Sequence, residues 1–154
     1  MSKGQIAVAV GALMITLIAA GCGGNEEAAP APITKAQFIK QADAACTKGN
    51  EHFQTLYEDY VKETKLDITK KRTAAQWAEI VEKVLAPPLE QEVAEVRALG
   101  VPKGDGGKIG AILGAIEEGL EKVEEDPSVA ANTEEEFRKS YKLATEYGLR
   151  VCGR

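Results

Sequence analysis

This sequence has little of what most metal, cofactor and nucleic-acid sites are built from. Its 154 residues include one histidine, one tryptophan and three cysteines, and aromatic residues make up 5% of the chain. No ligand cluster has the spacing of known zinc sites, and no Cys-x-x-Cys-His motif for covalent haem exists, so we expect no metal and no cofactor. Basic residues number 19 against 24 acidic ones. Because nucleic-acid binding requires a positive surface, we expect no nucleic-acid partner.

Long apolar runs are absent except near the start of the chain. Lys3 is followed by an apolar run that reaches Ala20, and Gly21 then precedes Cys22. The run has roughly 15 residues, fewer than the ~20 that span a bilayer, and this arrangement is typical of a bacterial lipoprotein signal peptide. We expect residues 1–21 to be cleaved and Cys22 to be acylated. Two alternatives stay open, namely release of a soluble protein by an ordinary signal peptidase and an uncleaved helical anchor.

The predicted leader sets the location of the rest of the chain. Residues 22–33 are rich in Gly, Ala, Glu and Pro without apolar periodicity, which predicts a flexible tether. Loss of Lys3 with the leader leaves 18 basic and 24 acidic residues, a formal charge of −6. A negative domain is not attracted to anionic lipid, so the lipid on Cys22 must hold it. We expect a lipid-anchored protein on the extracytoplasmic face of the cell membrane.

The number of cysteines agrees with this prediction. An unpaired thiol is unusual in an exported protein, and acylation of Cys22 removes one cysteine from the three. Cys46 and Cys152 then form the only possible intramolecular disulfide. On the chain-entropy account, closing a loop of about 106 residues stabilises the fold by roughly 4–5 kcal/mol.

Apolar residues recur at steps of three and four from Thr34 onward, which predicts an all-α fold. Three Thr residues are each followed three positions later by Gln or Glu, as in a capping box. The four predicted helical segments are residues 34–65, 73–100, 105–125 and 133–148. Because the connections between them are short, we expect residues 34–154 to form an antiparallel bundle of about four helices.

Proline and glycine predict local features of this bundle. Pro87 and Pro88 lack backbone donors, so we expect a break or kink at residues 86–88. Gly110 and Gly114 each cost the third helix up to ~1 kcal/mol relative to Ala, so we expect tight helix packing at these positions, against the small residues of the first helix. We expect the tail to dock on the first helix through the disulfide.

No set of catalytic residues can be named. Cys46 and His52 are six positions apart and lie on different sides of one helix, and Cys152 is the better partner for Cys46. Residues 104–108 are rich in Gly and end in Lys, but they lack the glycine and Ser or Thr positions of a phosphate-binding loop. We therefore expect a protein that is not an enzyme.

Four aromatic side chains are the best candidates for a binding surface. Phe53, Tyr57 and Tyr60 share the first helix, and Trp77 on the second helix can face them. They form either part of the core or a groove for a hydrophobic ligand or partner helix.

Two functions follow from these patterns. The favoured one is a non-enzymatic interaction or structural module that presents a helical surface to an envelope protein or the cell wall. The alternative is a small-ligand carrier or sensor with a pocket inside the bundle, near Trp77 and the Pro87-Pro88 break. An apolar cavity of several hundred cubic ångströms favours the carrier, whereas a filled core with an exposed apolar strip favours the interaction module.

Four segments resemble those of a known group of proteins. Residues 33–46 (ITKAQFIKQADAAC), 86–90 (APPLE), 99–102 (LGVP) and 147–153 (YGLRVCG) are similar to those of small predicted lipoproteins from actinobacterial envelopes. The resemblance implies an exported helical domain with paired cysteines near its two ends. It implies no particular activity.

Overall fold

The structure, a computed structural model, describes residues 32–153. Within this range every regular element is helical, which confirms the predicted all-α bundle. The predicted signal peptide, Cys22 and all but the last two residues of the predicted tether lie outside the described residues. The elements are α1 (Lys35–Thr64), α2 (Ala74–Ile80), a π-helical turn (Val81–Leu85), α3 (Ala86–Ala98), α4 (Gly106–Glu125), a 3-10 segment (Pro127–Asn132), α5 (Thr133–Glu136) and α6 (Arg138–Tyr147).

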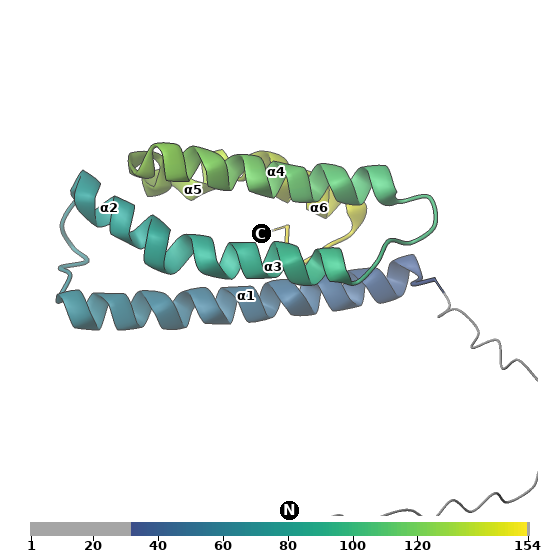
Figure 1. Ribbon diagram of the computed structural model, residues 1–154, viewed down its shortest axis with the longest axis horizontal. Coiled ribbons are helices and arrows are strands. Elements are labelled where there is room, and N and C mark those ends of the chain that lie inside the picture. The colour runs from purple at the N-terminus through teal and green to yellow at the C-terminus, as the bar shows by residue number, and fades with distance from the viewer. Residues whose placement is uncertain (1–31, 154) are drawn as a thin grey trace, which may run out of the picture. The chain divides into compact units, whose positions relative to one another are not determined.

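The helices pack as an up-and-down bundle (Figure 1). Helix α1 runs along one side, and α2, the π-helical turn and α3 form a second rod that returns beside it. Helix α4 lies across the bundle from α1, and α5 and α6 pack against α4. The chain after α6 turns back, so the C-terminal end of the described chain lies among the helices rather than beyond them. The core therefore lies between two pairs of rods.

Two of the three predicted capping boxes are present. Thr34 Oγ1 accepts from the Gln37 backbone N–H at 3.2 Å while Gln37 Oε1 accepts from the Thr34 N–H at 3.0 Å. Thr73 and Gln76 exchange the same pair of bonds at 3.2 and 2.8 Å. These reciprocal bonds satisfy donors that a helix start otherwise leaves free, so α1 and α2 begin where the sequence predicts.

The third predicted capping box, at Thr133, is wrong. Thr133 is already helical, with φ −56° and ψ −29°, because it continues from a 3-10 segment that Asp126 caps at its own start. The single turn of α5 then ends at Phe137, whose φ of −98° and ψ of 5° separate it from α6. The predicted last helix is thus two helices with Phe137 at the junction.

The break predicted at residues 86–88 is also wrong in place and kind. Pro87 and Pro88 lie within the first turn of α3, where their missing N–H groups cost little. The irregularity lies just before them, because the Ala86 N–H bonds to the carbonyl of Val81, five residues back. A π-helical turn widens the helix and makes room for the proline rings, which would otherwise clash with the preceding turn. The rod therefore continues through the prolines.

The small residues of α1 face α3, but the glycines of α4 do not face α1. Ala42 and Ala45 are buried, and a Cβ on Gly49 would lie 2.7 Å from Glu92 Oε2 of α3. By contrast, a Cβ on Gly110 or Gly114 would have nothing within 4 Å, so the predicted tight packing at these two glycines is wrong.

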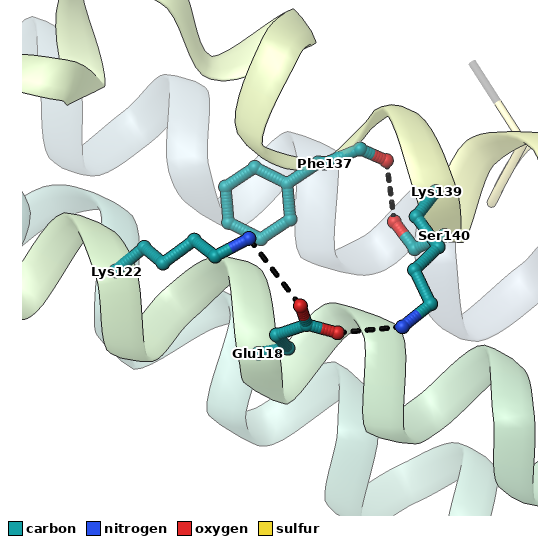
Figure 2. Close-up of polar contacts among 5 residues, drawn as sticks. All are labelled: Glu118, Lys122, Phe137, Lys139 and Ser140. Atoms are coloured by element: carbon teal, nitrogen blue, oxygen red, sulfur yellow. Dashed lines mark hydrogen bonds and ion pairs between the residues drawn. The ribbon is translucent and has the colours of Figure 1, made fainter.

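The close approach on α4 occurs at Gly119 instead. A Cβ there would lie 2.8 Å from two ring atoms of Phe137 and 3.1 Å from the Glu136 carbonyl oxygen. Figure 2 shows the Phe137 ring directed onto α4, next to a Glu118 carboxylate that bonds Lys122 at 3.3 Å and Lys139 at 2.7 Å. The Glu118 to Lys139 contact thus joins α4 to α6 beside the ring.

Gly119→Ala is expected to destabilise the protein by roughly 1–3 kcal/mol, because the added methyl must displace the Phe137 ring and backbone of α5. Gly114→Ala is the matched control, since its methyl meets nothing and it is expected to stabilise α4 by up to ~1 kcal/mol. Urea unfolding monitored by circular dichroism measures both changes. Equal effects of the two substitutions would contradict the packing described for Gly119.

The tail is fixed to α1 as predicted. Cys46 and Cys152 form a disulfide with a Cα–Cα distance of 5.3 Å. Asp43, one turn before Cys46, accepts from the backbone N–H groups of Arg150 at 2.9 Å and Val151 at 2.8 Å. The carboxylate satisfies donors that the turn after α6 leaves free, so the bridge and Asp43 together hold the C-terminal segment.

Candidate functional site

A cavity of about 190 Å³, partly open to solvent, lies among α1, α3, α4, the α5–α6 junction and the C-terminal segment. Most of its wall is apolar, and the disulfide contributes one edge through Cys152. The lining residues are Gly49, Asn50, Phe53, Leu85, Pro88, Leu89, Glu92, Ile116, Thr133, Phe137, Ser140, Tyr141 and Cys152. The cavity therefore depends on every major helix and on the predicted bridge.

The π-helical turn and the prolines help to shape this wall. Leu85 is the last residue of the π-helical turn, and Pro88 and Leu89 follow in the first turn of α3. All three line the cavity. A widened turn rotates the side chains that follow it relative to their positions in a regular helix. The Pro87-Pro88 pair therefore does not break the rod, and the π-helical turn before it helps to set which side chains face the cavity.

The α5–α6 junction supplies the aromatic wall opposite. Phe137 and Tyr141 have ring centroids 6.4 Å apart, and Phe53 of α1 lines the cavity from the other side. The Ser140 hydroxyl donates to the Phe137 carbonyl oxygen at 2.7 Å (Figure 2). Ser140 is thus engaged locally, and three aromatic side chains from two parts of the fold form part of the cavity wall.

Glu92 is the one charged side chain in the cavity wall. Its Oε1 lies 3.1 Å from Cys46 Sγ, which carries no proton to donate while it is in the disulfide. No ion pair joins Glu92 to a basic side chain among residues 32–153. Burial, and then the charge of Glu95, raise the pKa of Glu92 to about 7. Glu92 is therefore an acid whose charged form lacks a partner within the described fold.

Tyr141 faces the same electrostatic environment. Burial raises the pKa of its phenol, and the carboxylates of Glu92 and Glu134 raise it further. The hydroxyl makes no hydrogen bond to another side chain or backbone group in the described part of the chain. Glu92 and Tyr141 thus place an acceptor and a neutral donor on one cavity.

The four aromatic residues named in the sequence analysis pack together, as in its core alternative. Phe53, Tyr57, Tyr60 and Trp77 belong to one smaller hydrophobic cluster with Ile80 and Val84. Of the four, only Phe53 also lines the cavity.

Side-chain bonds hold this smaller cluster together. Arg72 lies over the Trp77 ring at 5.4 Å and donates to the Tyr57 hydroxyl at 2.7 Å. The Tyr60 hydroxyl donates to Glu79 Oε2 at 3.1 Å. Burial, followed by the Glu79 contact, raises the pKa of Tyr60. The cluster is a packed second core, separate from most of the cavity wall.

Two further groups near the cavity carry atoms of the kinds that bind metals or act in catalysis. Cys46, Glu92 and Cys152 offer ligand atoms within 4.8 Å of one another. A soft metal binds thiolates, however, and the disulfide leaves neither sulfur in that form. His52 lies at a separate cavity of about 50 Å³ on another side of Glu92, beside Lys48 and Glu95.

Sequence reasoning missed Glu92, Phe137 and Tyr141 as residues that line a cavity. The sequence does contain a signal for Glu92. Leu85, Leu89 and Val96 lie on one face of a predicted helix, and position 92 falls on that same face but holds an acid. An acid within an apolar stripe is unusual unless it is paired or functional.

The described residues contain no helix that is both long and apolar enough to cross a bilayer. No protein-family description, curated protein or solved structure matches this chain to a significant degree.

Proposed function

We propose that this protein is a lipid-anchored, extracytoplasmic binding module that holds a small molecule in the cavity between α1, α3 and the α5–α6 junction. The observation that carries the proposal is the cavity itself. It combines an apolar and aromatic wall with few polar groups, which is the usual composition of a small-molecule site. The alternative carrier function of the sequence analysis thereby becomes the preferred one.

The described surface supports a carrier over a helical interaction module. Only Ile68 and Val101 are large exposed apolar side chains among residues 32–153, at 59% and 51% exposure. They lie in the loops before α2 and before α4, at opposite ends of the bundle (Figure 1). Two separated side chains do not make the contiguous apolar patch that a partner helix needs.

The cavity chemistry favours binding over catalysis. Ser140 donates to a backbone carbonyl, and no base contacts it, so it lacks the activation that a nucleophile requires. Glu92 and Tyr141 can accept and donate a hydrogen bond. These two groups can orient a bound ligand. They do not form the chain of nucleophile, base and base-orienting group that covalent catalysis requires.

The size of the cavity limits its occupant. An engineered protein cavity of about 150 Å³ holds benzene, so a cavity of about 190 Å³ fits a molecule slightly larger than benzene.

Leu89→Phe places a larger side chain in the cavity, so it is expected to weaken binding of 2-phenylethanol, a molecule of this size, by about tenfold or more. The control is Leu143→Phe, because Leu143 is half-buried but does not line the cavity. Isothermal titration that shows no binding to the unmodified protein would sink the proposal of a ligand site.

The anchor is tested separately. Cys22→Ser removes the thiol that accepts the lipid, so the protein is expected to move from the membrane fraction to the medium, or to remain unprocessed. Cell fractionation and mass measurement of the N-terminal peptide check this. An unchanged membrane fraction with an unmodified peptide mass would exclude lipid anchoring at residue 22.

A further inference from the structure

The charge balance around the cavity distinguishes one class of small molecule. Glu92 lines the cavity and has no basic partner among residues 32–153. Lys48 of α1, which lines a neighbouring cavity with Glu92, is engaged elsewhere, since its Nζ lies 2.5 Å from Glu95 Oε1. Lys139, on α6, is likewise bonded to Glu118 on α4. The described fold thus leaves the Glu92 charge for a ligand to neutralise.

A half-buried carboxylate without a partner is costly for a fold. Burial penalises its charged form, and a single opposite charge nearby restores it. Glu92 borders a partly open cavity, so a small molecule that enters the cavity could supply this opposite charge. A cationic ligand would therefore gain the attraction of Glu92 without breaking any ion pair of the described chain.

The rest of the wall agrees with a cation that carries an apolar body. Phe53, Phe137 and Tyr141 surround the cavity, and aromatic rings bind both apolar groups and organic cations, the latter through their negative faces. A hydrated metal ion does not suit this wall, because one carboxylate and one phenol are too few oxygen ligands. An anion would meet Glu92 directly.

From these observations we infer that the cavity binds a small organic ammonium ion with an apolar body slightly larger than benzene, its nitrogen paired with Glu92. This inference rests on the proposed function and adds the ligand class to it. Tyr141 lines the same cavity, and its hydroxyl oxygen, which can accept as well as donate, would accept a hydrogen bond from the ammonium group. Apolar walls formed by Leu89 and Ile116 hold the body of the ligand.

The test compares three probes of one shape and different charge. They are 2-phenylethylammonium, the neutral 2-phenylethanol and the anionic 3-phenylpropionate, titrated into the full chain in phosphatidylcholine nanodiscs at pH 8. Glu92→Gln removes the charge at the site, and Glu90→Gln removes one from an exposed position on the same helix. Empty nanodiscs give the partition of each probe into lipid.

The ammonium probe is expected to bind at least tenfold more tightly than the alcohol. Glu92→Gln is expected to remove that difference, and Glu90→Gln to keep it. If the alcohol and the ammonium bind equally, or if Glu92→Gln leaves the preference intact, the ligand class is wrong while the cavity function stands. If no probe binds, both the ligand class and the proposed function are wrong.

A pH series provides a second readout. The charged and titratable groups around Glu92 are Glu95 on α3, Lys48 and His52 on α1, and Tyr141 on α6. Ammonium affinity is expected to increase about tenfold from pH 6 to pH 8 as Glu92 ionises. His52→Asn is the control, because it removes the imidazole beside the neighbouring small cavity and leaves Glu92 in place, and it is expected to keep the increase. A flat profile in the unmodified protein would contradict pairing with Glu92.

Discussion

Loss of the Cys46–Cys152 disulfide is expected to lower the free energy of unfolding by about 4 kcal/mol, the largest effect of any single change considered. The bridge joins residues 106 positions apart, so it restricts the unfolded chain strongly. For a domain whose net stability is ordinarily about 5–15 kcal/mol, such a loss leaves a large unfolded population.

Urea unfolding of the Cys46→Ala/Cys152→Ala protein, compared with the unmodified protein, measures this loss. Reductant is expected to reproduce it in the unmodified protein and to have no effect on the double variant. A transition midpoint that reduction leaves unchanged would show that the bridge does not contribute to stability.

The bridge also affects the cavity. Cys152 lines it, and Cys46 lies 3.1 Å from the Glu92 carboxylate. Asp43 still accepts two backbone donors from the tail after reduction, so the segment is expected to stay near α1 while it loses its fixed position. Probe binding is therefore expected to weaken in the double variant even where the bundle remains folded.

The parts of the fold that follow from local chemistry could be predicted. The capping boxes at Thr34 and Thr73, the C-terminus of α6 at Gly148 and the cysteine pair depend on few neighbours or on parity, and the structure shows them where the sequence predicts. The expected box at Thr133 failed because a preceding 3-10 segment, which sequence periodicity does not reveal, had already set its backbone.

Features that depend on which helices meet could not be predicted. Gly114 and Gly119 look alike in sequence, yet only Gly119 meets Phe137, because the position of α6 decides which side of α4 is covered. The cavity likewise forms where several elements meet, so no single segment predicts it. Glu92 was missed as well, although the acid within an apolar stripe is a signal that the sequence itself carries.

Glu92→Gln is expected to stabilise the protein by roughly 2–3 kcal/mol at pH 8 and to have little effect at pH 4. The carboxyl titrates at about 7 in the fold, against 4.5 for an unperturbed glutamate, chiefly because burial penalises its charge. Between these values the folded protein binds more protons than the unfolded chain. Stability therefore decreases as the pH rises through this window, and the amide variant lacks that contribution.

Urea unfolding of both proteins from pH 4 to pH 8 measures the difference, and other titrating groups cancel because the two proteins share them. Glu90→Gln is the control, since Glu90 is exposed on the same helix and is expected to show no comparable pH-dependent gain. A Glu92→Gln protein that is less stable than the unmodified one at pH 8 would mean that the carboxylate has a partner.

An ammonium ligand reverses this effect. With saturating 2-phenylethylammonium, the charged form of Glu92 gains its partner, so the decrease in stability above pH 5 is expected to become smaller in the unmodified protein. The amide variant is expected to respond little to the same ligand. Because the stability loss and the ligand gain then arise from one carboxylate, the two pH profiles together separate a binding group from a residue that is merely buried.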